Sequence, residues 1–292
     1  MRLSNYIGKT PMIRISDKLF AKAEFLNPTG SIKDRPATYI INDAEMKGLI
    51  KPGDTIIEAT SGNMGISFAW LAAERGYNCK IVMPSNMSEE RKHMLKLYGA
   101  ELIEVGEGDF DGAINLRNEL SEKNGWFNCN QFHNQLNILA HKETTTKEIL
   151  DFFDKNEDLY ISAVVSGTGT GGTLMACNYN IVKKYPICKT IAVEPEESAV
   201  MSGGKPGLHG IQGIGDGSKF LVDLNVVDEI ITINTEDAKN RAVRLAKEDG
   251  IFVGISAGAN VLASEKWIEK NKPEGIVVTF LCDRGERYLT CM

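Results

Sequence analysis

Short apolar runs alternate with amphipathic segments along most of the chain, a pattern typical of a mainly parallel sheet covered by helices. The predicted strands are short, rich in Ile and Val, and span residues 55–58, 80–83, 101–105, 161–165, 190–193, 230–233 and 275–281. The predicted helices carry apolar residues at helical spacing and span residues 65–74, 89–98, 112–123, 136–153, 173–184, 236–248 and 259–270. The alternation predicts an α/β fold.

Two earlier apolar runs, residues 12–15 and 19–25, are separated only by Ser-Asp-Lys and therefore predict a local antiparallel hairpin. The chain contains no internal repeat, low-complexity tract or flexible linker. Any domain boundary is therefore expected where the chain crosses between two packed lobes.

The composition favours an enzyme that acts on a small molecule. The 292 residues are 42% hydrophobic and 25% charged, which is enough to bury a large core. The net charge of -6 argues against nucleic acid or an anionic membrane as a partner, because there is no excess of Lys and Arg to neutralise phosphates. No apolar stretch has the length of a bilayer span, and the first residues do not resemble a signal peptide, so we expect a cytoplasmic protein.

The six cysteines are scattered, with no CxxC pair and no histidine at ligand spacing. Neither a zinc site nor a redox dithiol is indicated, and no metal is expected. Cys79 and Cys282 lie in apolar runs and are expected to be buried.

The first motif, residues 27–36, reads Asn-Pro-Thr-Gly-Ser-Ile-Lys-Asp-Arg-Pro. Turn residues come first, Asp34 is suited to cap a helix and Pro36 to its first turn, so Lys33 is expected where a loop enters a helix. The positive field of a helix N-terminus, together with partial burial, favours the neutral amine that an imine-forming lysine needs. A solvated lysine at a helix start is the alternative.

The second motif, residues 60–65, reads Thr-Ser-Gly-Asn-Met-Gly and links a predicted strand to a helix. Backbone N–H groups at such a turn, with the hydroxyls of Thr60 and Ser61, form a cradle for a carboxylate. Asn63 is placed either to bind a ring hydroxyl of a cofactor or to cap the helix.

The third motif, residues 166–173, reads Ser-Gly-Thr-Gly-Thr-Gly-Gly-Thr, and its small residues let the backbone approach a phosphate. It also matches GxGxxG at Gly167, Gly169 and Gly172, with Glu194 at the end of the next strand as a candidate ribose ligand. Dinucleotide binding therefore remains open. The ordinary P-loop is excluded because no Gly-Lys-Ser/Thr follows.

The fourth motif is Gly-Ile-Ser-Ala-Gly-Ala at residues 254–259. Ser256 is placed either to cap the last long helix or to face a pyridine nitrogen. A neutral hydroxyl partner leaves that ring a weaker electron sink, which suits β-elimination better than transamination.

Together, these four motifs resemble those of cysteine synthase (O-acetylserine sulfhydrylase) and its cystathionine β-synthase relatives, in the same order. The resemblance extends from Ile-Gly-Lys-Thr-Pro at residues 7–11, through the glycine segments at residues 202–207 and 210–215, to Gly-Glu-Arg-Tyr-Leu at residues 285–289. It covers nearly the whole chain.

The resemblance implies a two-lobed fold-type II pyridoxal-phosphate enzyme, usually a homodimer. Residues 1–36 and 134–292 would form a larger cofactor-binding domain, and residues 37–133 a smaller, mobile substrate-binding domain. The implied activity is β-replacement of the cysteine synthase type, in which O-acetylserine and sulfide give cysteine and acetate through an α-aminoacrylate intermediate. An acetyltransferase that docks its C-terminus in the active site is a partner known in the family.

The resemblance also assigns the site residues. Lys33 would carry pyridoxal 5'-phosphate as an imine and move the α-proton, Asn63 would contact the ring hydroxyl, and Ser256 would meet the ring nitrogen. The phosphate would be bound by Gly169, Thr170, Gly171, Gly172 and Thr173. The substrate carboxylate would be bound by Thr60, Ser61, Asn63 and Gln131, and Gly62 and Met64 would also belong to the substrate-binding loop.

The chain departs from the family pattern at several positions. Met64 replaces the usual threonine, and the segment at residues 130–134 keeps Gln131 but adds His133. Asp216 follows a glycine segment expected to face the substrate, where the family more often has a small or aromatic residue. It is either an exposed turn aspartate or a catalytic carboxylate that repels anionic nucleophiles and takes a proton from water or a thiol.

The second interpretation of Asp216 predicts a cysteine-consuming lyase that releases hydrogen sulfide, with water (giving serine) or a thiol as the incoming nucleophile. Two further hypotheses are an NAD-dependent dehydrogenase built on the GxGxxG match and a non-catalytic paralogue that binds another protein. The first leaves Lys33 and Asn63 unexplained, and the intact set of cofactor residues argues against the second.

Overall fold

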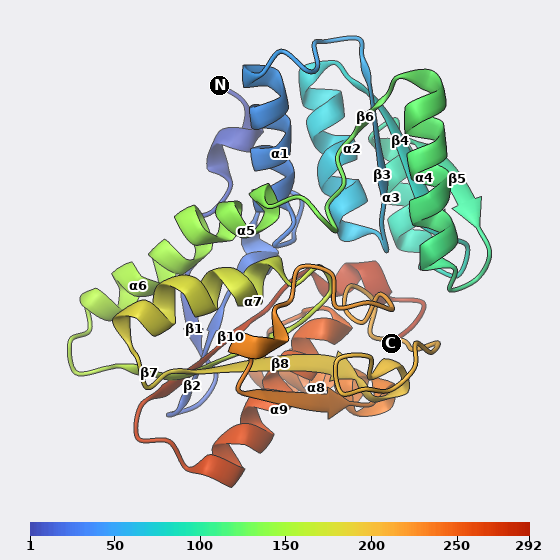
Figure 1. Cartoon of the computed structure of the whole chain (residues 1–292). Coiled ribbons are helices and arrows are strands. Elements are labelled where there is room, and N and C mark those ends of the chain that lie inside the picture. The colour runs from blue at the N-terminus through green and yellow to red at the C-terminus, as the bar shows by residue number, and fades with distance from the viewer.

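The computed structural model describes all 292 residues and divides the strands between two sheets, each packed between helices (Figure 1). The larger sheet has the order β1-β2-β10-β7-β8-β9, and the smaller has the order β5-β4-β3-β6. Only β1 and β2 pair antiparallel; every other pair is parallel. The predicted α/β class with mainly parallel strands is confirmed.

The strands are β1 (Met12–Arg14), β2 (Leu19–Lys22), β3 (Thr55–Ala59), β4 (Asn78–Pro84), β5 (Glu101–Val105), β6 (Phe127–Asn128), β7 (Ile161–Gly167), β8 (Lys189–Pro195), β9 (Glu229–Ile233) and β10 (Ile276–Phe280). The α-helices are α1 (Asp34–Met46), α2 (Asn63–Arg75), α3 (Glu89–Leu97), α4 (Phe110–Asn124), α5 (Leu136–Ala140), α6 (Thr146–Asp154), α7 (Gly172–Cys177), α8 (Thr235–Asp249) and α9 (Ile255–Asn271). The short turns are π-helical η3 (His141–Thr145) and η4 (Asn178–Val182) and 3₁₀-helical η1 (Leu3–Tyr6), η2 (Glu24–Leu26), η5 (Glu196–Ser198), η6 (Leu224–Val226) and η7 (Gly285–Tyr288). No helix has both the length and the apolar character needed to cross a bilayer.

The larger sheet is buried on both faces, which explains its continuous apolar strands. Val165 and Val277 point to the side covered by α8 and α9, whereas Val164 and Val278 point to the side covered by α6 and α7. Gly258 lets α8 and α9 approach closely, because a β-carbon there would lie 2.2 Å from the carbonyl oxygen of Ala238.

The smaller sheet follows the same rule. Ile56 and Ile81 pack against α1, α2 and α3, and Ile57 and Val82 pack on the side of α4. Parallel strands of both sheets thus end among helix starts and loops, which is where α/β proteins bind ligands.

The predicted hairpin is confirmed by β1 and β2, although β2 ends at Lys22, three residues before the predicted end. Every other predicted strand is present, with ends that differ by at most two residues. The helices at 136–153 and 173–184 are present but contain the π-turns η3 and η4, which apolar periodicity does not reveal. The list of predicted helices and strands omitted α1 and β6. The division of function between residues 37–133 and the rest of the chain stays a prediction.

Candidate active site

The predicted site residues lie at the carboxyl ends of strands from both sheets. Lys33, Asn63, Ser256 and the whole run Gly169–Thr173 line one cavity, here called the inner cavity, together with Ile32, Ser166, Gly167, Gly213, Ile214 and Cys282. An adjoining cavity shares Lys33, Asn63, Thr170 and Gly213 with it and is also lined by Thr60, Ser61, Met64, Gln131 and Asp216. Motifs separated by more than 200 residues therefore converge.

Lys33 occupies the N-cap position of α1 and is half-buried. Burial lowers the pKa of its ammonium group, and the acidic groups of Cys282, Asp216 and Asp283 oppose that effect. A neutral amine is therefore accessible at this position, as the first motif predicts. Cys282 lines the inner cavity and is only half-buried, so the prediction that it is buried was wrong, whereas Cys79 is buried.

Asp34 is the first residue of α1 and makes no cap, contrary to the prediction. Its carboxylate accepts hydrogen bonds from the backbone N–H of Thr29 (2.7 Å) and the hydroxyl of Ser67 (2.6 Å). It thereby ties the loop before Lys33 to α2, and no local pattern could indicate the contact with α2 because Ser67 is 33 positions from Asp34.

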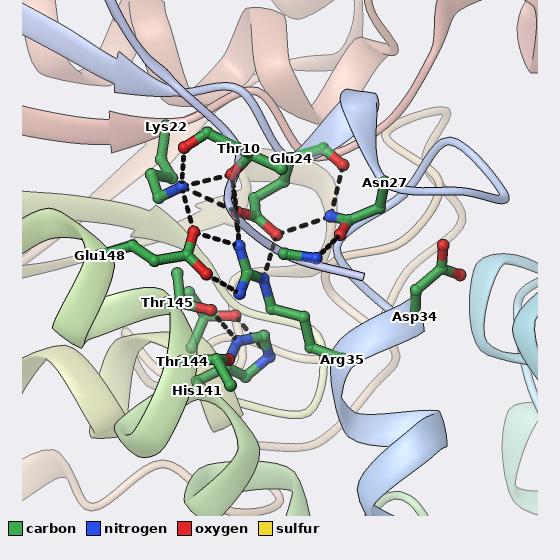
Figure 2. A network of polar contacts seen from close by, with 12 residues as sticks. Thr10, Lys22, Glu24, Asn27, Asp34, Arg35, His141, Thr144, Thr145 and Glu148 are labelled. Carbon is green, nitrogen blue, oxygen red and sulfur yellow. Dashed lines mark hydrogen bonds and ion pairs between the residues drawn. The ribbon is translucent and has the colours of Figure 1, made fainter. Parts of the chain in front are cut away.

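An ionic cluster joins the buried side chains of Lys22, Glu24 and Arg35 to the half-buried Glu148 (Figure 2). Arg35 Nε donates to Glu24 Oε2 and Arg35 Nη1 donates to Glu148 Oε1, both at 2.7 Å, and Lys22 Nζ lies 2.7 Å from Glu148 Oε2. Because Arg35 follows Lys33 by two positions, these contacts fix the start of α1 against β2, η2 and α6.

The glycine-rich loop after β7 is shaped for close backbone approach. Gly171 has φ +88°, and a β-carbon there would lie 2.5 Å from Val222 Cγ2. A β-carbon at Gly172 would lie 2.2 Å from Asn137 Oδ1, and Asn137 Nδ2 donates to Thr170 Oγ1 at 3.0 Å. The backbone of the loop can therefore approach a phosphate, whereas a residue with a side chain would not fit at position 171 or 172.

His141 is a functional candidate that the sequence analysis missed. It is buried in the π-turn η3, with Nδ1 2.8 Å from Thr145 Oγ1 and Nε2 3.3 Å from Thr173 Oγ1. Burial lowers its pKa to about 3, and the charge of Lys33 adds to the effect. The neutral ring orients the hydroxyl of Thr173 at the end of the glycine loop. The feature that points to a functional role for His141 is the π-turn, which is visible only in the structure.

Ser256 is the second residue of α9, and Gly254 is the N-cap, so the capping alternative for Ser256 was wrong. The buried Ser256 hydroxyl makes no hydrogen bond within the chain and faces the inner cavity. Asn63 opens α2 and donates from Nδ2 to Asp283 Oδ2 at 2.6 Å, leaving its buried Oδ1 without a partner. Buried polar groups without partners inside a chain are expected to meet a bound molecule.

Of the predicted substrate-binding residues, all except Gly62 line the adjoining cavity. Gly62 does not line either cavity: it has φ +138°, and a β-carbon there would lie 2.3 Å from Arg91 Cδ. Gln131 lines the adjoining cavity while its Nε2 donates to the carbonyl oxygen of Ala59 at 2.8 Å. His133 is exposed, contacts Asn130 and lines none of these cavities.

Asp216 is only 7% exposed, so the interpretation as an exposed turn residue was wrong. Its carboxylate makes no hydrogen bond within the chain and lines the adjoining cavity beside Lys33. Burial raises its pKa, against the opposing effects of His209, Lys33 and Arg91.

The contacts of Glu194 contradict the hypothesis of dinucleotide binding, in which this residue would bind a ribose. Its two carboxylate oxygens accept hydrogen bonds from the backbone N–H groups of Met201 (2.8 Å) and Ser202 (2.9 Å), and it does not line the inner cavity. No cluster of three or more His, Cys, Asp or Glu side chains is arranged to hold a metal ion.

The inner cavity fits pyridoxal phosphate. It offers an amine at Lys33, a narrow glycine and threonine loop for a phosphate, and unpartnered polar atoms on Ser256 and Asn63 for ring substituents. The fold and this donor set define a pyridoxal-phosphate enzyme built on parallel sheets. The chain belongs to the family of pyridoxal-phosphate dependent enzymes, whose sequence model matches residues 3–283.

Known relatives agree with this assignment. The chain is 42% identical to the cysteine synthase of Staphylococcus aureus, over 99% of this chain and 95% of that protein. It is 41% identical to the O-ureido-L-serine synthase of Streptomyces lavendulae, over 97% of this chain and 89% of the relative. A solved hydrogen sulfide-producing enzyme of Fusobacterium nucleatum superposes with a TM-score of 0.91 and 37% identity, over 99% of this chain and 90% of the other. The fold-type II architecture expected from the resemblance is thereby confirmed.

Proposed function

We propose that this protein is a β-replacement enzyme of cysteine metabolism, of the cysteine synthase type, which forms cysteine and acetate from O-acetylserine and sulfide. The observation that carries the proposal is the convergence of Lys33, Asn63, Ser256 and the glycine loop on one cavity that adjoins the Thr60–Met64 loop. The relatedness to cysteine synthase supports it.

Pyridoxal phosphate bound in the inner cavity supplies the electron sink that makes the α-proton of the substrate acidic and its β-substituent a leaving group. Lys33 would hold the cofactor, remove the α-proton and later return it. Its buried position favours the neutral amine that these steps need. Gly169–Thr173 would hold the phosphate, Asn63 the ring hydroxyl and Ser256 the ring nitrogen.

The substrate carboxylate would meet the hydroxyls of Thr60 and Ser61 and the backbone N–H groups at the start of α2. Gln131 lies in the same cavity and completes the polar wall. Met64 is 1% exposed and adds an apolar side chain where the family pattern has a hydroxyl, which narrows the space for the substrate.

Asp216 favours a second candidate function, the consumption of cysteine with release of hydrogen sulfide. A buried carboxylate with a raised pKa beside Lys33 is suited to take a proton from water or a thiol, and it repels the hydrosulfide anion. Relatedness to a hydrogen sulfide-producing enzyme supports this candidate.

Four measurements test these proposals. Purified protein should absorb visible light through its bound cofactor, and Lys33→Ala should lose turnover. Full turnover without Lys33 would refute the assignment. Comparing kcat/KM for O-acetylserine plus sulfide with that for cysteine alone decides between synthesis and consumption. If Asp216→Asn leaves hydrosulfide release from cysteine unchanged, the second candidate is wrong.

We further propose a cytoplasmic homodimer in which residues 37–133 form a mobile domain that closes over substrate, with an acetyltransferase C-terminus as a candidate partner. Sedimentation of the purified protein tests the dimer. Scattering with and without substrate tests closure, and co-purification with the acetyltransferase tests the partnership.

A further inference from the structure

Asp283 is a fully buried carboxylate that lines neither the inner cavity nor the adjoining one. It follows β10, and its carbonyl oxygen accepts a hydrogen bond from the backbone N–H of Gly254, at the start of α9, at 3.0 Å. An isolated β-bridge also pairs Asp283 with Ser31, two residues before Lys33. The backbone of Asp283 is therefore held by two segments that lead into predicted site residues.

The side chain of Asp283 meets three polar groups at a single oxygen, Oδ2. Asn63 Nδ2 and the Tyr288 hydroxyl each donate a hydrogen bond to it at 2.6 Å. Arg91 Nη2 lies 3.6 Å away, and its positive charge compensates the buried carboxylate. Because Asn63 opens α2 and Arg91 lies in α3, Asp283 connects the end of a strand of the larger sheet to two helices of the smaller one.

This arrangement is not the most stable one for a buried position. The second oxygen of Asp283, Oδ1, is buried and makes no hydrogen bond. A side chain at Gly254 would leave no room for it, because a β-carbon there would lie 2.1 Å from Oδ1. A buried carboxylate with an unpaired oxygen costs folding free energy that apolar groups of similar volume would avoid. We therefore looked for a role of Asp283 in the site.

The charge of Asp283 determines which end of the Asn63 amide faces it. A carboxylate only accepts hydrogen bonds, so it selects Nδ2 of Asn63 and excludes Oδ1. Oδ1 of Asn63 is buried without a partner, and Asn63 lines both cavities. The atoms left for a ligand are thus Oδ1 and the second hydrogen of Nδ2. The nearby negative charge also polarises the amide, which makes Oδ1 a stronger acceptor.

We propose that Asp283 is a positioning residue for the cofactor, which it serves by fixing the Asn63 amide in the one orientation that meets the ring hydroxyl of pyridoxal phosphate. The inference rests on the assignment of Asn63 to that hydroxyl, proposed above. After Asp283→Asn, the side chain at this position offers both a donor and an acceptor, so either end of the Asn63 amide can face it. The orientation of the amide is then no longer fixed.

The test uses two properties of the bound cofactor: its visible absorption maximum and its affinity, measured by titration of the apoenzyme. Asp283→Asn should shift the maximum and weaken cofactor binding about tenfold. Asn63→Ala should also change both properties. In a protein that already carries Asn63→Ala, Asp283→Asn should cause no further shift, because Asp283 acts through Asn63.

Tyr288→Phe is the matched control, because it removes the other hydrogen bond to the same carboxylate oxygen and leaves the Asn63 contact in place. It should leave the absorption maximum and the cofactor affinity unchanged. Gly254→Ala is a second perturbation, for use if Asp283→Asn does not fold. Its methyl group should displace the Asp283 carboxylate without removing the charge, and it should shift the maximum only when Asn63 is present.

The outcomes separate this inference from the proposed function. If Asn63→Ala changes the spectrum and affinity but Asp283→Asn changes neither, the inference alone is wrong. A shift by Asp283→Asn that is equal with and without Asn63, or that Tyr288→Phe reproduces, would also overturn it, because the effect would then be a general loss of packing. If Asn63→Ala changes nothing, the assignment of Asn63 to the cofactor ring is wrong, and the inference fails with it.

Discussion

Replacing Glu24 by glutamine should destabilise the protein strongly although Glu24 touches neither cavity. Glu24 is fully buried within the ionic cluster, where it accepts hydrogen bonds from Arg35 Nε and Nη2, both at 2.7 Å. The substitution leaves Glu148 as the single carboxylate facing the buried Arg35 and Lys22. Breaking a buried ion pair from one side costs about 3–5 kcal/mol, because a charge remains without compensation.

The pKa of Glu24 leads to a similar magnitude. Burial by itself raises this pKa, but the charge and hydrogen bonds of Arg35, with Lys22 and Thr10, outweigh it and lower the value from 4.5 to about 2. That difference corresponds to roughly 3 kcal/mol of folding free energy. The contribution is fully present above pH 4.5, the value in the unfolded chain, and is lost as the pH falls through about 2.

Urea unfolding of the holoenzyme, followed by tryptophan fluorescence, measures both effects. Glu24→Gln should lower the unfolding free energy at pH 7 by about 3 kcal/mol or more and should weaken its decline below pH 4.5. Asp17→Asn is the control, since Asp17 pairs with Arg14 on the surface, where such pairs contribute little. A cost at pH 7 below about 1 kcal/mol, or an unchanged decline in acid, would refute the reasoning.

Three further predictions concern the site. Arg91→Met should raise KM for the amino-acid substrate roughly tenfold, because buried Arg91 packs against the substrate loop and donates a hydrogen bond to Tyr288 in the C-terminal segment. Steady-state kinetics measure this change. Lys92→Met is the control, since the partners of Lys92 all lie near the smaller sheet. Gly172→Ala should weaken cofactor binding about tenfold in a spectroscopic titration, because the added methyl group would meet Asn137. His141→Gln should make Tm decline less steeply between pH 6.5 and about 5. The reason is that the folded protein keeps the His141 ring neutral, whereas the unfolded chain protonates it below pH 6.5. A decline of Tm with the same slope in both proteins would contradict the prediction.

Local chemistry accounts for what could be predicted from the sequence. Turn residues before Lys33 place it at a helix start, and the glycine loop before Thr173 follows a strand, because both depend on a few consecutive residues. The second, third and fourth motifs follow predicted strands or precede predicted helices, and ligands of parallel sheets bind at the carboxyl ends of the strands.

Other features depend on residues that are distant in sequence. Asp216 is buried where the loop at residues 206–217 packs against the glycine loop after β7, with the backbone N–H of Gly215 donating to the carbonyl oxygen of Thr168 at 3.0 Å. Sequence alone left Asp216 between a surface turn and a catalytic group. Asp283 receives hydrogen bonds from Asn63 and from Tyr288, both at 2.6 Å, and nothing near it in the chain indicates those partners.

By itself, then, the sequence determined the α/β class, the positions of the strands and the chemistry carried by each loop, since hydrophobic period and turn geometry act over a few residues. Only the tertiary structure decided which polar groups are buried and left free to bind a ligand. Burial and pairing depend on how α1, α9 and the loops pack together, and the pKa of the Asp216 carboxyl is raised because that packing removes water from around it.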